Sequence, residues 1–107
     1  MAWLLLALAG TFETAFAISL KLSEGFSRAW WTVSFVVFAV ASFALLAEAL
    51  KTLPVGTAYA VWTGIGAVGT AVVGMIVFGE SAAVARLVSI GLVVAGVVGL
   101  QVTSTSH

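Results

Sequence analysis

The chain has 107 residues, of which 63% are hydrophobic and 7% carry a charge, and its formal net charge is zero. This composition excludes an ordinary soluble domain, in which about a quarter of the residues are charged, and the neutral charge gives no reason to expect a nucleic-acid partner. Apolar runs of about 18 residues or more are typical of membrane-crossing helices. The sequence contains four such runs, which predict an all-α integral membrane protein of one domain, residues 1–107, with helices at about 2–21, 29–50, 55–78 and 85–103.

The connections between the runs carry nearly balanced basic charge. Lys51 and the N-terminal amine lie on one side of the membrane, and Lys21, Arg28 and Arg86 lie on the other. Because Lys/Arg asymmetry sets orientation, a bias this small leaves the orientation weakly specified. We expect the chain to insert into the inner (plasma) membrane both ways round, so that two opposed copies form an antiparallel homodimer related like an inverted repeat. One dominant orientation is the alternative.

The first run contains AGTFETAFAISLKL and holds one carboxyl group, that of Glu13. It lies about 12 Å along the helix from Lys21, which places it near mid-membrane. A charge there costs about 2.5–3.5 kcal/mol on insertion scales, and no Lys, Arg or His lies at comparable depth in the four runs. An intramembrane acid without a counterion is by default a functional site. We predict that Glu13 binds either a proton or an organic cation, and a hydrogen bond across the bundle is the alternative.

The neighbours of Glu13 on its helix face are mostly small. Gly10 and Phe16 lie three residues before and after it, and Ala9 and Ala17 lie four residues away, so all of them share its face. Small side chains leave room for a ligand beside the acid, although they also permit close helix packing.

The second run places Ser42 and Phe43 near its middle. The Ser42 hydroxyl has two expected partners, a carboxylate on a neighbouring helix or its own helix backbone, which is the commoner acceptor for a membrane serine. Glu48 and Lys51 lie three residues apart at the end of the run and predict a solvated ion pair of little energetic weight.

The third run carries two aromatic residues and a glycine cluster. Tyr59 and Trp62 lie on one helix face, where their rings attract a cation, although such residues are also common at the membrane interface. Gly64, Gly66 and Gly69 follow. Because glycine weakens a helix, we expect a bend or hinge there, with close packing as the alternative.

The fourth run has no aromatic or charged residue after Arg86. Gly91, Ala95 and Gly99 recur every four positions and form a small-xxx-small stripe, which lets two helix backbones approach closely. We predict that this stripe is the dimer interface.

The sequence resembles the small multidrug resistance transporters over essentially its whole length. The resemblance lies in four short apolar runs, an acid in the first, and GTAYAVWTGIGA in the third. KTLPVGTAYAVWTGIGAVG and the closing GVVGL look like the guanidinium-exporter branch of that family. The resemblance implies an antiparallel, dual-topology dimer that exchanges protons for cations.

Carried over by position, the resemblance makes Glu13 of each subunit the carboxylate shared by proton and substrate. Gly10 would admit the substrate, and Lys21 corresponds to the family's lysine at the end of the first helix. The predicted substrate-binding residues are Gly10, Glu13, Phe16, Ser42, Phe43, Tyr59 and Trp62.

One residue departs from the branch pattern. Phe16 stands where guanidinium exporters usually carry tryptophan, so the N–H donor of that ring is missing, and LSEGF is closer to the branch that exports quaternary ammonium compounds. The predicted substrate is a small guanidinium-type cation, with quaternary ammonium or other lipophilic cations as the alternative.

Two further alternatives concern the class of protein and its partner. The alternative to a transporter is a non-transporting membrane assembly subunit. The alternative to a homodimer is a heterodimer with a similar chain. An enzyme, a metal site and a cofactor are not expected, because no nucleophile–base pair or metal-ligand set lies at membrane depth.

Overall fold

The computed structural model describes residues 1–104, and His107 and the two residues before it lie outside the described part. Four helices follow one another along the chain: α1 (Ala2–Leu22), α2 (Ala29–Ala49), α3 (Val55–Val77) and α4 (Val84–Ser104). Their ends lie within one residue of the expected ones. Each helix is long and apolar enough to cross a membrane.

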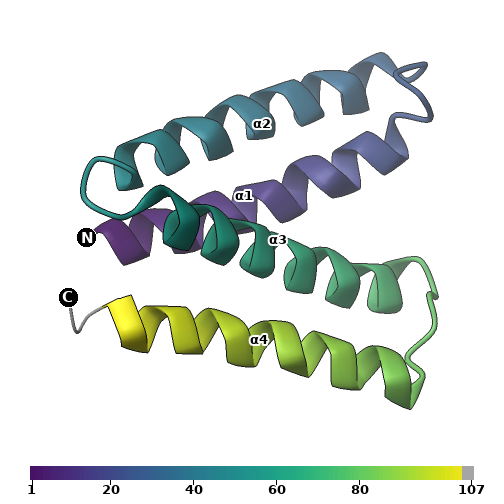
Figure 1. Ribbon diagram of the computed structural model, residues 1–107. Helices are drawn as coiled ribbons and strands as arrows, with labels where there is room; N and C mark the ends of the chain where they lie inside the picture. Colours follow the sequence, from purple (N-terminus) through teal and green to yellow (C-terminus); the bar gives the residue numbers. More distant parts are fainter. Residues whose placement is uncertain (105–107) are drawn as a thin grey trace.

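The helices run alternately up and down, so that the connections lie at two ends of the bundle (Figure 1). The α1–α2 and α3–α4 connections lie at one end, and the α2–α3 connection lies at the other with the start of α1 and the end of α4 (Figure 1). This arrangement places Lys21, Arg28 and Arg86 at the same end of the molecule.

The core of the chain lies where α1, α2 and α3 meet. Its buried hydrophobic residues are Leu6, Ala9, Leu46, Ala49, Ala58, Val61 and Trp62. Most other large apolar side chains point outward. An outward apolar surface is stable in lipid, because hydrocarbon solvates leucine and valine as well as a protein interior does.

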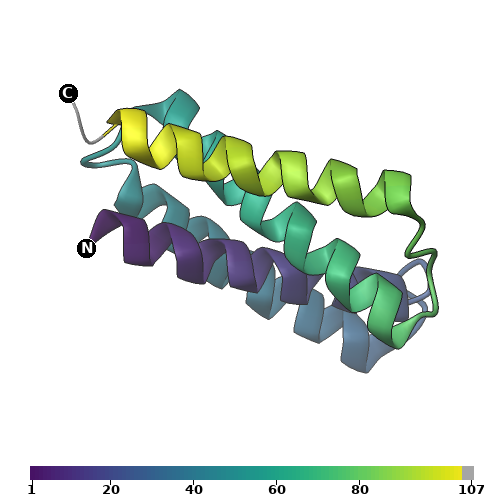
Figure 2. The same ribbon diagram turned by 90° about the horizontal axis from the view of Figure 1, so that it is seen from below.

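The fourth helix stands apart from this core. Within residues 1–104, α4 packs against α3 and against no other helix, and none of its residues from Val84 to Thr103 is buried. Figure 2 shows α4 on the side of α3 that faces away from α1 and α2. One face of α4 is therefore covered by this chain, and the rest of its surface is open.

A glycine and a proline mark the two ends of α3. Glycine at position 79 has a φ of +66°, which allows the backbone N–H groups of Phe78 and Glu80 to bond the carbonyl of Gly74 as α3 ends. A left-handed glycine after the last turn is a common helix stop. Pro54 precedes α3, where its missing N–H is not needed.

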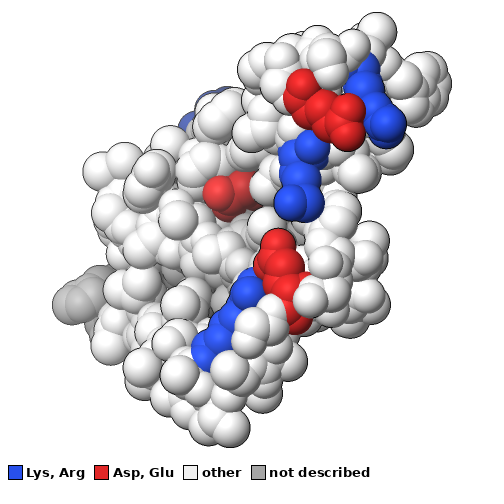
Figure 3. Space-filling model, turned by 90° about the vertical axis from the view of Figure 1, so that its right-hand side faces the viewer, with Lys and Arg blue, Asp and Glu red and all other residues white. Residues whose placement is uncertain are grey.

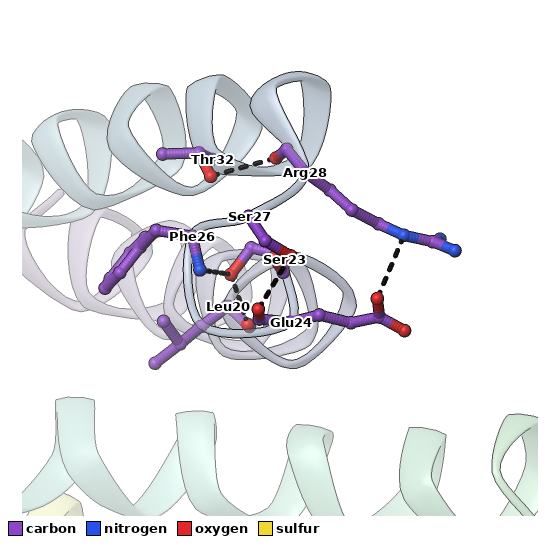
Figure 4. A network of polar contacts seen from close by, with 7 residues as sticks. All are labelled: Leu20, Ser23, Glu24, Phe26, Ser27, Arg28 and Thr32. Carbon is purple, nitrogen blue, oxygen red and sulfur yellow. Dashed lines mark hydrogen bonds and ion pairs between the residues drawn. The ribbon is translucent and has the colours of Figure 1, made fainter.

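The α1–α2 connection is a tight turn held by Ser23 (Figure 4). Its hydroxyl donates to the carbonyl of Leu20 at 2.7 Å and accepts the N–H of Phe26 at 3.2 Å. Glu24, Gly25 and Phe26 all have positive φ, a conformation that favours glycine. The buried serine and the ion pair of Glu24 with Arg28 at 3.3 Å hold the turn in this shape.

Candidate functional site

Glu13 lies near the middle of α1, and its carboxyl group rests against α3. A Cβ atom at Gly66 would overlap the Glu13 carboxyl group, so only glycine permits this approach. Glu13 Oε1 is shielded from solvent and has no hydrogen-bond donor within residues 1–104. Of the two expectations for Glu13, the hydrogen bond across the bundle is therefore not formed by the described chain.

The basic side chains of residues 1–104 are engaged elsewhere. Arg28 pairs with Glu24 at 3.3 Å, Lys51 with Glu48 at 2.9 Å and Arg86 with Glu80 at 2.7 Å. The predicted solvated pair of Glu48 and Lys51 is confirmed.

The remaining lysine, Lys21, lies with its Nζ 5.1 Å from the centre of the Phe78 ring. Figure 3 shows acidic and basic side chains side by side at the end that carries the α1–α2 and α3–α4 connections. Within residues 1–104, no cation forms an ion pair with the acid inside α1.

Four of the predicted binding residues form a connected row of aromatic rings across three helices. The Phe16 ring of α1 lies 6.0 Å from the Phe43 ring of α2, and Phe43 lies 5.4 Å from Trp62 of α3. Trp62 in turn lies 5.6 Å from Tyr59. Trp62 is buried, whereas Tyr59 is 58% exposed. The row therefore begins at Phe16, three residues after Glu13, and ends at an open face of α3.

Ser42 connects these three helices, but not in either of the expected ways. Its hydroxyl donates to the carbonyl of Ala9 in α1 at 2.7 Å and accepts the indole N–H of Trp62 at 2.9 Å. It bonds neither the Glu13 carboxylate nor its own helix. Ala9 presents no side chain beyond Cβ, so the serine reaches the α1 backbone one turn before Glu13. These two hydrogen bonds hold the Trp62 indole at the level of Ala9 in α1.

Gly10 also lies at a close contact. A Cβ atom there would come within 2.7 Å of Cβ of Ile65 and 3.5 Å from the carbonyl oxygen of Trp62. In this conformation Gly10 brings α1 against α3, and Ile65 occupies the space beside it. Admission of a substrate by Gly10 stays a prediction.

The three glycines predicted as a hinge are all sites of close approach. A Cβ atom at Gly64 would overlap Val97 of α4, at Gly66 the Glu13 carboxyl group, and at Gly69 the Thr14 hydroxyl group. The helix α3 is continuous from Val55 to Val77. Each glycine thus has a packing partner, and hinge motion stays a prediction.

A hollow of about 320 Å³ lies between α3 and α4. It contains none of the predicted substrate-binding residues, and its lining is Gly64, Ile65, Val68, Gly69, Val94, Val97 and Val98. Such a lining has no group that would hold a cation.

Comparison with known proteins settles the family. The model of the family described as Small Multidrug Resistance protein matches residues 1–93. The chain belongs to this family. The resemblance seen in the sequence is confirmed, and the molecule is a multi-pass membrane protein with four spans.

Similar small multidrug resistance proteins bear the name guanidinium exporter. The one from Yersinia pseudotuberculosis is 55% identical over 104 residues, which cover 97% of this chain and 100% of that protein. Those from Salmonella typhimurium strain LT2 and Citrobacter freundii are 52% and 50% identical, and each match covers 97% of this chain and 99% of the relative. The similarity thus extends over all four spans and all predicted site residues.

The small-residue stripe of α4 is free in this small multidrug resistance chain. Gly91, Ala95 and Gly99 are exposed, and Cβ atoms built at Gly91 and Gly99 meet nothing within 4 Å. The stripe therefore lies away from the described contact with α3, in which Val97 sits over Gly64. Its use as a dimer interface stays a prediction.

Thr14 is not among the residues predicted from the sequence, yet it lies at the site. Its hydroxyl is 3.3 Å from the carbonyl oxygen of Gly66, the residue against which the Glu13 carboxyl group rests. A threonine in an apolar helix usually bonds its own backbone, so the sequence offers little signal. In the structure, Gly66 faces Glu13 and Gly69 faces Thr14. The three-residue spacing of these glycines, which puts them on one face of α3, is the only hint of this contact in the sequence.

Proposed function

We propose that the protein is a proton-coupled antiporter that exports small guanidinium-type cations across the inner (plasma) membrane. One observation carries this proposal: a carboxyl group near mid-membrane has a buried oxygen without a donor and without a counterion in residues 1–104. A group of this kind needs a proton or a cation from outside the chain. The guanidinium exporters similar to this chain over nearly its full length support the choice of cation.

The chemistry of guanidinium suits such a site. Guanidinium is planar and presents N–H donors along its edges, so it forms charge-assisted, bidentate hydrogen bonds with carboxylates. The faces of Trp62 and Tyr59 add cation–π attraction. Because Glu13 holds either a proton or the cation, entry of one requires departure of the other. That exclusion is what couples the two flows in opposite directions.

We propose further that the transporting unit is an antiparallel homodimer. The exposed face of α4, the 58% exposure of Tyr59 and the balanced loop charges support this assembly. Two opposed copies would place two Glu13 carboxylates at one site, as the inverted repeats of larger transporters do for their binding residues. A heterodimer with a similar chain is the alternative, and co-purification of a tagged chain with an untagged copy distinguishes the two.

Forcing one orientation should abolish transport. The basic charges stand at two against three, so Ser81→Lys in the α3–α4 connection raises the bias to two against four. The opposite bias needs three lysines at the α2–α3 end, at Thr52, Val55 and Gln101, which make the count five against three. All four positions are exposed. Each variant alone should export at near-background rates, and expression of both together should restore export. Unchanged export by either variant alone would contradict an antiparallel unit.

A proteoliposome assay tests the substrate. Guanidinium and a tetra-alkylammonium ion are added separately to proteoliposomes, and proton movement is followed with a pH-sensitive dye. Phe16 keeps a π face but offers no N–H donor, and tetra-alkylammonium ions have no donor either, so they depend on charge and aromatic faces. We expect guanidinium to drive proton movement. Movement with tetra-alkylammonium alone would refute the guanidinium proposal, and movement with neither ion would favour a non-transporting assembly subunit.

A further inference from the structure

Glu13 and Thr14 are adjacent in α1 and face adjacent turns of α3. The Glu13 carboxyl group occupies the space that the absent Cβ of Gly66 leaves open, which we name the Gly66 slot. The Thr14 hydroxyl occupies the corresponding space at Gly69. At this level of the bundle, α1 and α3 therefore meet through two side chains of α1 and two glycines of α3.

The Thr14 hydroxyl has two acceptors at equal distance. Its Oγ1 lies 3.3 Å from the carbonyl oxygen of Gly66 in α3 and 3.3 Å from the carbonyl oxygen of Gly10 in α1. A hydroxyl has one proton to donate, so a strong bond to one carbonyl weakens the bond to the other. Donation to Gly66 ties α1 to α3 at the Gly66 slot. Donation to Gly10 stays within α1 and leaves the two helices free to separate.

The second acceptor lets the hydrogen bond from Thr14 to the Gly66 carbonyl break without leaving the hydroxyl unpaired. A buried donor that loses its only partner is strongly unfavourable. Thr14 avoids that state, because the Gly10 carbonyl is already within reach when the bond to Gly66 breaks. The contact between α1 and α3 at this level thus has two satisfied arrangements.

We propose that Thr14 is a positioning residue that holds the Glu13 carboxyl group in the Gly66 slot between binding events. In the slot, Glu13 Oε1 is shielded and has no donor in residues 1–104, so this oxygen is not presented to a ligand. A guanidinium ion that pairs with both carboxylate oxygens binds only the fraction of molecules in which the carboxyl group has left the slot. Apparent affinity falls in proportion to that fraction, so the Thr14–Gly66 bond weakens cation binding. The part that concerns the cation rests on the proposed function.

The test compares Thr14→Val with Thr11→Val in the purified, detergent-solubilised protein. Valine matches the shape of threonine but has no hydroxyl. Thr11 is a matched control, because it lies in the same helix. Within residues 1–104 its hydroxyl bonds only its own helix backbone, donating to the carbonyl of Ala7 at 2.8 Å. The readout is the rate at which a carbodiimide modifies Glu13 without substrate, located by mass spectrometry of the peptide. A second readout is the dissociation constant for guanidinium.

We expect Thr14→Val to increase the rate of Glu13 modification about threefold. The reason is that loss of an average interhelical hydrogen bond in a membrane shifts an equilibrium by about that factor. Guanidinium should bind about threefold more tightly for the same reason. Thr14→Ser, which keeps the hydroxyl, should restore the parent values. Thr11→Val should match the parent in both measurements.

Equal modification rates in Thr14→Val and Thr11→Val, or a slower rate in Thr14→Val, would overturn the inference. If Thr14→Val does not assemble, Thr14→Ala and Thr14→Ser give the same comparison, because only the second keeps a hydroxyl. Carbodiimide modification needs no substrate. A parent protein that binds no guanidinium would therefore refute the proposed function, while the modification rates would still decide the role of Thr14.

Discussion

Replacing Glu13 with glutamine should abolish proton-coupled export of guanidinium. Glutamine keeps the length of the side chain and its hydrogen-bonding atoms, but it carries no charge and takes up no proton in this pH range. It therefore offers no counterion to the cation and no site for the returning proton. We expect the rate of guanidinium uptake by proteoliposomes under a pH gradient to fall to that of protein-free liposomes at every pH.

Glu48→Gln is the matched control for this result. Glu48 is an acid at the end of α2, exposed and paired with Lys51, and an exposed pair contributes about 0.2–1 kcal/mol. Its variant should transport like the parent. Export by Glu13→Gln that still depends on pH would show that another group carries the proton.

Truncating Trp62 to alanine should cause the largest loss of stability among single changes in the aromatic row. Trp62 is 6% exposed, packs against Phe43 and Tyr59, and donates its indole N–H to Ser42. Removal of a buried aromatic ring typically costs about 3–5 kcal/mol. The change also removes the only N–H donor that Ser42 Oγ receives in residues 1–104. We expect an earlier midpoint in SDS-induced unfolding and loss of guanidinium binding.

Trp30→Ala provides the comparison. Trp30 lies at the start of α2 and is 78% exposed, so its truncation leaves no cavity. Its unfolding midpoint should differ little from that of the parent. A Trp62→Ala protein as stable as Trp30→Ala would mean that the packing between α1, α2 and α3 does not depend on the Ser42 network.

Much of the fold follows from hydropathy. Four apolar runs of membrane-crossing length leave few alternatives to four helices, because backbone groups in lipid must be paired within the segment. Glu13 is conspicuous for the same reason, since a lone acid in such a run has a large desolvation cost. Both expectations depend on composition along the chain, which the sequence displays directly.

The partners of the site residues depend instead on how the helices rotate and cross. The sequence predicts that Ser42 bonds a carboxylate or its own helix, whereas its partners are the carbonyl of Ala9 and the indole of Trp62. These contacts require α1, α2 and α3 to meet at one depth, which no periodicity in a single helix specifies.

The glycines of α3 show the same limit. A cluster of glycines is compatible with a hinge or with close packing, and only the crossing of the helices decides which glycine faces which side chain. Gly66 faces Glu13, and Gly69 faces Thr14. The pairing also explains why Thr14 escapes notice in the sequence, because its significance arises only opposite these two glycines.

Proton release on cation binding is the most direct test of a carboxyl group shared by proton and substrate. Guanidinium is added to the detergent-solubilised protein in weakly buffered solution at several pH values, and the released protons are followed with an indicator dye. The parent protein should release protons in proportion to bound guanidinium, its affinity should weaken as the pH falls, and Glu13→Gln should release none. Guanidinium binding without proton release at any pH would contradict the account.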